Sequence, residues 1–294
     1  MEWAERFQLF TTPELRDRAS AAEYGRIPVY GYPGAPAEQT YTAARFMMSW
    51  FLLDDSIEGV GAGARTESIL NGLRQLEDLL PTAPRCADWR TLGMLLAEGM
   101  SLAWVERNAD VFAAWIGSVR DEAALFRCHG PTPPLRAYLD VRSHTVGMDV
   151  SSALGEYAYR REVPTRLQHD PHKGEAARLI GLLQTIDNDL HGLTKDHKAG
   201  WHNAVFALAA EHNTTWAAAC AKLLALRDAW LSRLLEVEAQ VCDRYGDPAE
   251  QWFTDQHHLM TGLLLWQHQV GRYQRTHQTP DGETITLHVK GTRT

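Results

Sequence analysis

Residues 50–58 read Trp-Phe-Leu-Leu-Asp-Asp-Ser-Ile-Glu, an apolar run followed at once by two neighbouring acids and then by a third. On a helix, Asp54 and Glu58 are four positions apart and lie one above the other on the same face. Like charges at that spacing repel unless a cation lies between them, and hard oxygen ligands of this kind suit Mg²⁺. We interpret Asp54, Asp55 and Glu58 as candidate metal ligands, with an acidic helix end in solvent as the alternative.

The rest of the chain predicts helices almost throughout. Apolar residues recur at helical spacing, and Pro and Gly separate the segments. The predicted helices cover residues 37–58, 66–80, 88–128, 135–160 with an interruption near Gly147, 173–197, 201–212, 214–245 and 248–274. Residues 283–289 read as a short strand or as irregular chain. We expect an all-α bundle with a central apolar cavity, forming one domain over residues 1–294, with an irregular segment at 1–36 and a tail at 275–294.

Composition excludes several classes of protein. Of the 294 residues, 45% are hydrophobic and 22% are charged, which is ordinary for a globular chain. The net charge of −8 argues against a nucleic-acid partner. Four scattered cysteines without a CxxC pair fit a reducing compartment, and we expect a cytoplasmic protein. The N-terminus does not read as a signal peptide, and the apolar runs are too short for stable membrane insertion.

A second acidic stretch, residues 188–196, reads Asn-Asp-Leu-His-Gly-Leu-Thr-Lys-Asp. Asn188, Gly192 and Asp196 follow each other at intervals of four and share one helix face over roughly 12 Å. Asn188 and Asp196 place oxygen ligands at the two ends of that face, and Lys195 is positioned to meet a phosphate oxygen. The alternative is a helix end exposed to solvent, in which the glycine makes one turn more flexible.

The two stretches together resemble the metal-binding motifs of class I terpene synthases. Residues 54–58 are similar to the aspartate-rich motif, and residues 188–196 to the second motif, NDxxSxxxE. Arg142, 46 positions before Asn188 (188 − 142), matches the family's diphosphate-sensing arginine, and Arg272-Tyr273 matches its C-terminal Arg-Tyr pair. The resemblance covers roughly residues 40 to 275. It departs from the family pattern where Gly192 replaces a hydroxyl residue, where Asp196 replaces Glu, and in a short N-terminal segment.

The resemblance implies an assignment of roles. Three Mg²⁺ ions would be held by Asp54, Asp55, Glu58, Asn188, Gly192 and Asp196, with a water completing the shell at the glycine. The diphosphate would be bound by Arg142, Lys195, Arg272 and Tyr273. Thr145 and Val146 match the linker and effector positions after the sensor arginine, which makes the catalytic set Arg142, Thr145, Val146, Arg272 and Tyr273.

The same resemblance gives the wall of the substrate pocket and the reaction. Met47, Trp50, Phe51 and Trp266 are candidates for an apolar wall, with plain helix packing as the alternative. The implied activity is ionisation and cyclisation of a linear prenyl diphosphate to a terpene hydrocarbon or alcohol, by a monomer or homodimer. Farnesyl diphosphate is favoured by chain size, and geranyl or geranylgeranyl diphosphate is the alternative. Two other hypotheses stay open: an isoprenyl chain-elongating transferase, and an inactive helical prenyl-binding protein.

Overall fold

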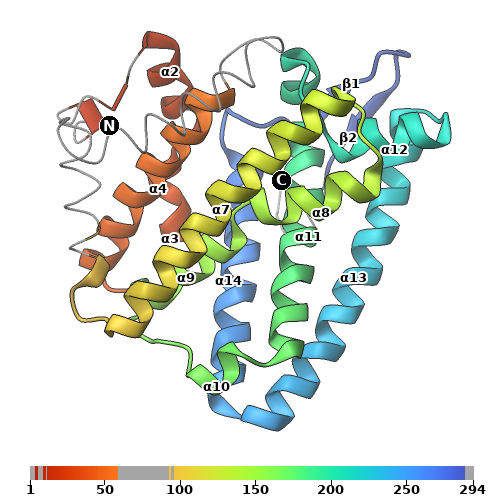
Figure 1. Cartoon of the computed structure of the whole chain (residues 1–294). Helices are drawn as coiled ribbons and strands as arrows, with labels where there is room; N and C mark the ends of the chain where they lie inside the picture. The colour runs from red at the N-terminus through yellow and green to blue at the C-terminus, as the bar shows by residue number, and fades with distance from the viewer. Residues whose placement is uncertain (1–3, 6–8, 11, 59–92, 94–95, 289–294) are drawn as a thin grey trace.

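The computed structural model describes residues 4–5, 9–10, 12–58, 93 and 96–288, and for residues 53 and 55–58 the backbone alone. Its described part is almost entirely helical, which confirms the all-α prediction (Figure 1). The long helices are α4 (Ala37–Glu58), α7 (Leu102–His129), α11 (Pro171–Ala199), α13 (Trp216–Tyr245) and α14 (Asp247–Gln269). Shorter elements are α8 (Leu135–Thr145), α9 (Met148–Ala158), α10 (Thr165–Gln168) and α12 (Ala204–His212), with antiparallel strands β1 (Thr276–Gln278) and β2 (Thr284–Thr286) in the tail. No helix within the described residues has the length and apolar character needed to cross a bilayer.

Helix α11 lies at the centre of the bundle, where it contacts α8, α9, α12, α13 and α14 (Figure 1). A helix that is apolar on nearly every side belongs in a core. The middle of α11 meets that condition, and its buried apolar residues are Leu179, Ile180, Leu182, Leu183, Ile186, Leu190 and Leu193. Asp189, Gly192 and Asp196 are buried with them. The second acidic stretch is therefore held inside the protein, which removes the solvated helix end as its interpretation.

Asp170 starts α11 and ties it to the end of α13. Its carboxylate accepts the backbone N–H groups of His172 at 2.8 Å and Lys173 at 3.2 Å, as an N-cap residue does. The Tyr245 hydroxyl donates to the same carboxylate at 2.9 Å, and Arg244 forms an ion pair with it. Burial opposes ionisation of this carboxyl, but the hydrogen bonds outweigh burial and lower its pKa to about 2, against an ordinary 3.8.

We expect Asp170→Asn to lower the free energy of unfolding at pH 7 by about 1–3 kcal/mol, because Asn keeps the cap but loses the charged bonds. Since the folded pKa lies below the unfolded one, the stabilisation is present above pH 4 and is lost as the pH falls toward 2. Urea denaturation at intervals from pH 5 to pH 2 measures both effects. The variant should lack this component of acid sensitivity, and equal pH dependence in the two proteins would contradict the assignment.

The expectation of an irregular N-terminal segment over residues 1–36 is wrong for residues 13–31. That part folds into α2 (Pro13–Ala22), the 3-10 helix η1 (Tyr24–Arg26) and α3 (Ile27–Gly31). Proline stands in the first turn of both α2 and α3, where its missing N–H costs nothing. Pro13 and Pro28 thus mark the starts of short helices, and Gly31 ends the second of them. Tyr24, between these helices, is buried and belongs to the core.

The predicted interruption near Gly147 is confirmed, since α8 ends at Thr145 and α9 begins at Met148. Gly147 has a φ of 79°, in the left-handed region that favours glycine. A Cβ atom at this position would lie 2.3 Å from the indole of Trp50. The glycine is therefore needed twice, for the backbone turn and for close approach of α4.

Candidate active site

A narrow cavity of about 50 Å³ lies between α4, α7, α11, α14 and the break that separates α8 from α9. Its wall is largely apolar and aromatic on α4, α7 and α14, where it is formed by Met47, Trp50, Phe51, Trp115, Leu263 and Trp266. Charged and polar groups border the cavity from α4, α8, α11 and the residues after α14, namely Asp54, Arg142, Asn188, Lys195, Arg272 and Tyr273. The remaining lining residues are Thr145, Val146, Ser151, Gln184 and Gln267. The cavity thus has a polar end and an apolar body.

Helix α4 presents one face to this cavity. Met47, Trp50, Phe51 and Asp54 follow at intervals of three, one and three, which places them along one side of a helix. Met47 and Trp50 are buried, and Asp54 is half-buried at the polar end. The backbone of Asp55 and Glu58 belongs to α4, but their side chains lie outside the described part of the structure, so their role as ligands stays a prediction.

Aromatic rings pack against one another around the cavity. The Trp50 ring centroid lies 5.3 Å from that of Trp115 in an edge-on arrangement. Phe51 lies 5.8 Å from Trp266, and Trp266 lies 5.5 Å from Tyr273. Such rings present electron-rich faces, which attract cations by about 0.5–2 kcal/mol each. The wall predicted from the sequence is therefore part of a continuous aromatic lining.

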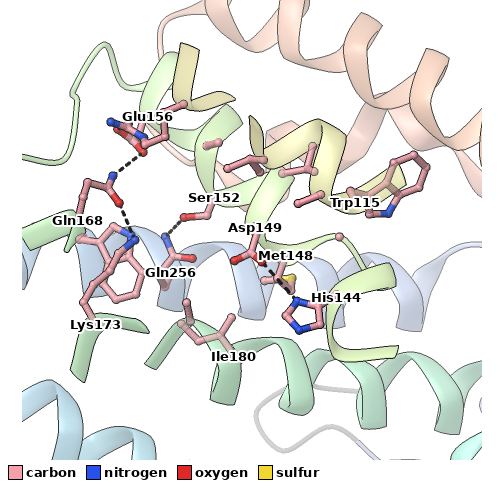
Figure 2. A pocket seen from close by; sticks show the side chains of 18 residues that line it. Trp115, His144, Met148, Asp149, Ser152, Glu156, Gln168, Lys173, Ile180 and Gln256 are labelled. Atoms are coloured by element: carbon pink, nitrogen blue, oxygen red, sulfur yellow. Dashed lines mark hydrogen bonds and ion pairs between the residues drawn. The ribbon is translucent and has the colours of Figure 1, made fainter. Parts of the chain in front are cut away.

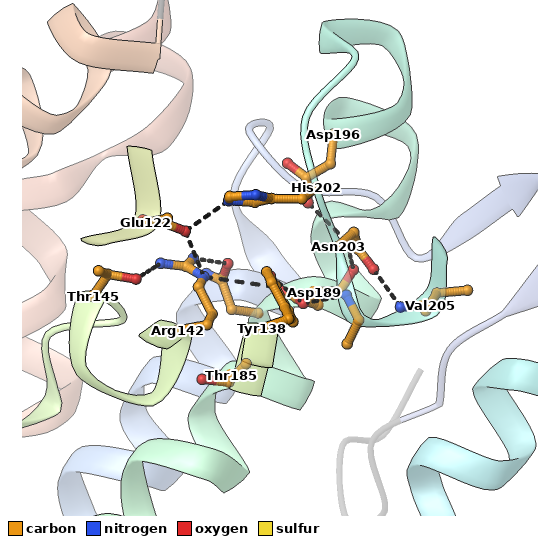
Figure 3. A network of polar contacts seen from close by, with 12 residues as sticks. Glu122, Tyr138, Arg142, Thr145, Thr185, Asp189, Asp196, His202, Asn203 and Val205 are labelled. Atoms are coloured by element: carbon orange, nitrogen blue, oxygen red, sulfur yellow. Dashed lines mark hydrogen bonds and ion pairs between the residues drawn. The ribbon is translucent and has the colours of Figure 1, made fainter. Parts of the chain in front are cut away.

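Arg142 lies at the junction of three helices, beside the cavity (Figure 3). Its Nη1 donates to Thr145 Oγ1 at 3.2 Å, and its Nη2 donates to Asn188 Oδ1 at 3.1 Å. Its Nε lies 3.9 Å from carboxylate oxygens of both Glu122 and Asp189. One guanidinium thus connects the helix break to the second acidic motif.

The charges around Arg142 are coupled in a buried network. Burial alone would lower the pKa of Arg142, but Glu122 and the surrounding groups, which include Asp189 and Asp54, raise it well above its usual range. Burial also opposes ionisation of Glu122, yet Arg142 and a 2.9 Å contact with His202 Nε2 lower its pKa. The guanidinium is therefore held as a cation, with Glu122 ionised beside it.

Asn188 is held between two of the predicted diphosphate ligands. Its Oδ1 accepts from Arg142, and its Nδ2 donates to the Tyr273 hydroxyl at 3.0 Å. Arg272, the neighbour of Tyr273, lies with its guanidinium carbon 5.7 Å from the Tyr24 ring centre. Tyr24, in the N-terminal segment that the sequence predicts to be irregular, therefore lies beside the candidate site.

Asp196 has two partners in its own part of the fold. Its Oδ2 accepts from Asn203 Nδ2 at 2.9 Å, and its Oδ1 forms an ion pair with Lys195 Nζ at 3.0 Å. A Cβ atom at Gly192 would lie 2.8 Å from that Oδ2. Gly192 therefore leaves room for the Asp196 carboxylate, in addition to offering no side-chain ligand of its own.

The donor set fits a hard cation such as Mg²⁺. A carboxylate on Asp54 and an amide oxygen on Asn188 border one cavity, and Mg²⁺ in proteins takes a few such oxygen ligands together with waters and substrate phosphates. Within the described side chains no three His, Cys, Asp or Glu residues form a metal cluster, and Asp55 and Glu58 are not among them. At Asp196, metal ligation requires that the carboxylate exchange its ion pair with Lys195.

Several site residues are not predicted from the sequence. Glu122 and His202 lie 80 positions apart in the chain, so spacing carries no sign of their contact. Gln184 stands one turn before Asn188, and Gln267 follows Trp266, so a helical projection from the motifs would have reached both. The other unpredicted lining residues are Trp115, Ser151 and Leu263.

A second cavity of about 160 Å³ lies farther along α11 and α14 and shares Trp115 with the first (Figure 2). Its polar groups satisfy one another. Glu156 accepts from Arg107 at 2.5 Å and from the backbone of Val163 at 2.8 Å, and Lys173 donates to Gln168 at 2.9 Å. The polar groups of the second cavity are therefore paired with one another, and the rest of its lining is apolar and includes Val111, Met148, Ile180 and Trp252.

Comparison with known proteins is consistent with this geometry. The family model described as terpene synthase family 2, C-terminal metal binding, matches residues 45–233. Pristinol synthase from Streptomyces pristinaespiralis is 27% identical over 301 residues, covering 94% of this chain and 79% of its own. Pentalenene synthase from Streptomyces avermitilis is 25% identical over 295 residues, covering 93% of this chain and 86% of its own.

Solved structures share the fold. 2-Methylisoborneol synthase from Streptomyces coelicolor A3(2), in complex with Mg²⁺ and 2-fluoroneryl diphosphate, gives a TM-score of 0.79 at 21% identity, over 92% of this chain and 90% of its own. Linalool/nerolidol synthase from Streptomyces clavuligerus, in complex with 2-fluorogeranyl diphosphate, gives 0.78 at 22% identity, over 91% and 95%. At these sequence identities, the comparison with the solved structures shows a shared fold only.

Proposed function

We propose that this chain, which belongs to terpene synthase family 2, ionises a linear prenyl diphosphate with the help of Mg²⁺ and cyclises the resulting carbocation. The observation that carries the proposal is the two-part cavity. Two oxygen donors from separate motifs and three basic side chains border its polar end, and aromatic rings line its body. An anionic leaving group would fit the polar end, and a hydrophobic chain would fit the apolar body.

The polar end would bind and activate the diphosphate. Arg142, Lys195, Arg272 and the Tyr273 hydroxyl supply charged and neutral donors for an anion with several oxygens. Asp54 and Asn188, with Asp55, Glu58 and Asp196 from the same motifs, would hold Mg²⁺ in a set of three ions. Bound there, Mg²⁺ supplies Lewis-acid stabilisation of the leaving diphosphate. Preorganised charge of this kind contributes several kcal/mol to ionisation.

The apolar body would protect the carbocation. Trp50, Phe51 and Trp266 exclude water and present ring faces to positive charge. Val146, at the helix break, would take the effector position that the resemblance implies, and the carbonyl of the neighbouring Thr145 accepts the Trp115 indole N–H at 3.1 Å. The cavity of about 50 Å³ is well below the roughly 300 Å³ of small-ligand pockets, so substrate entry requires the aromatic wall to move apart.

Farnesyl diphosphate is the favoured substrate, on the basis of chain size and of relatives that include sesquiterpene synthases from Metarhizium brunneum. The test is incubation of the purified protein with geranyl, farnesyl or geranylgeranyl diphosphate and Mg²⁺, with diphosphate release and volatile products both measured. We expect metal-dependent release and a cyclic product from farnesyl diphosphate. Elongated prenyl diphosphates formed with added isopentenyl diphosphate would support a transferase instead, and absence of turnover with all three substrates would overturn the proposal.

A further inference from the structure

Two glutamine side chains line the aromatic cavity, and three of their amide atoms are buried without a hydrogen-bond partner among the described residues. Gln184 on α11 is 3% exposed and Gln267 on α14 is 1% exposed. Among the described residues, no partner exists for Gln184 Oε1 or for either Oε1 or Nε2 of Gln267. Both side chains line the cavity.

These buried amide atoms without partners lower the stability of the folded protein. A buried polar group without a partner destabilises a protein by about 1–3 kcal/mol, and a leucine or methionine of similar size would avoid that cost. Buried polar groups in native structures are otherwise almost always satisfied by protein or by ordered water. Three unpaired amide atoms, on two side chains that line one small cavity, therefore indicate a polar ligand in that cavity.

Their positions place this ligand close to the reacting carbons. Gln184 lies one turn before Asn188 on α11, and Gln267 lies five residues before Arg272 near the end of α14. Helices α11 and α14 pack against each other. The amides therefore lie on the apolar side of the predicted diphosphate ligands, where the prenyl chain would be held.

The size of the site favours water. A water molecule needs about 10–15 Å³ of free volume and two to four polar partners. The cavity offers about 50 Å³, and the two amides provide donors and acceptors. Among the described lining residues, the carboxylate is that of Asp54 at the polar end, and no His lines the cavity, so the apolar body holds no side-chain base.

We propose that Gln184 and Gln267 hold a water molecule that ends the reaction by adding to the carbocation, so that the product is a terpene alcohol. This inference rests on the proposed function. The water oxygen donates a lone pair to the cationic carbon and forms the C–O bond. The oxonium so formed loses one proton to an oxygen of the released diphosphate. Atoms and charges balance as prenyl diphosphate plus water giving terpenol plus hydrogen diphosphate, with no oxidant involved.

The test measures oxygen incorporation rather than rate. The wild-type enzyme is incubated with its prenyl diphosphate in H₂¹⁸O, and the products are analysed by mass spectrometry alongside diphosphate release. We expect a main product that is an alcohol carrying one ¹⁸O. We also expect Gln184→Met and Gln267→Met, which keep side-chain length but remove the amide, to lower the alcohol-to-hydrocarbon ratio at least about tenfold, since 1.4 kcal/mol corresponds to a factor of 10.

Gln240→Met is the matched control, because it makes the same exchange at an exposed glutamine of α13 that does not line the cavity. It should keep the oxygenated fraction of the products. Thermal unfolding of each variant separates a folding defect from a change in product, and the wild-type isotope result stands without any variant. Diphosphate release with hydrocarbons alone would overturn this inference and leave the proposed function standing. An ¹⁸O fraction unchanged in both Gln variants would also overturn it, and absence of any release would overturn both proposals.

Discussion

Asp54→Asn is expected to lower the rate of diphosphate release by at least about 10³-fold, because under the proposed function it removes a charged metal ligand whose loss costs several kcal/mol of transition-state stabilisation. Asparagine has nearly the same shape as aspartate, so the cavity that Asp54 borders keeps its volume. The far-UV helical signal and the midpoint of thermal unfolding should stay close to those of the wild type.

The measurement is release of diphosphate from saturating farnesyl diphosphate over a series of Mg²⁺ concentrations. Glu38→Gln is the matched control, since Glu38 is an exposed acid in the first turn of the same helix, and it should leave the rate unchanged. A near-normal rate for Asp54→Asn would remove α4 from the metal site.

Arg142→Met will have the largest effect on stability, about 3–5 kcal/mol of unfolding free energy, because it leaves buried carboxylates without their cation. Glu122 and Asp189 are both buried, and Arg142 Nε lies 3.9 Å from each carboxylate. The same change removes the donor to Asn188 and a proposed diphosphate ligand, so we also expect a loss of turnover of about 10²–10³-fold.

Urea denaturation followed by circular dichroism gives the free energies. Glu122→Gln in the Arg142→Met background removes one of the stranded charges, so the double variant should be more stable than the sum of the single effects predicts. Arg136→Met, at an exposed arginine on the same helix, is the surface control and should change stability by less than about 0.5 kcal/mol. Simple additivity would show that the two charges do not interact.

The sequence predicts most of the helices and the residues that meet at the cavity, because helical spacing fixes which side chains share a face. Met47, Trp50, Phe51 and Asp54 are one such set, and Asn188 with Lys195 is another, whereas Asp196 of the same motif does not line this cavity. Motif order along the chain was enough to associate Arg142 with Asn188, which the structure joins by a hydrogen bond. The catalytic and metal-binding roles of these residues remain predictions.

What the sequence does not predict depends on contacts between distant segments. The Glu122–His202 contact arises only from the packing of α7 against the residues before α12, and neither residue stands in a motif. The direction of the Asp196 carboxylate depends on Asn203, beyond the end of α11. The N-terminal helices are short and rich in Pro and Gly, so their local sequence pattern gives little evidence for them. What holds them is packing against α4, where the ring centroids of Tyr24 and Phe51 lie 4.6 Å apart.

Trp115 borders both cavities, of about 50 and 160 Å³, so the boundary between them depends in part on this one side chain. A smaller residue at this position would enlarge the space beside the aromatic wall. Under the proposed function, such a substitution would change the room for the prenyl chain, while the polar groups around Asp54 and Asn188 keep their places.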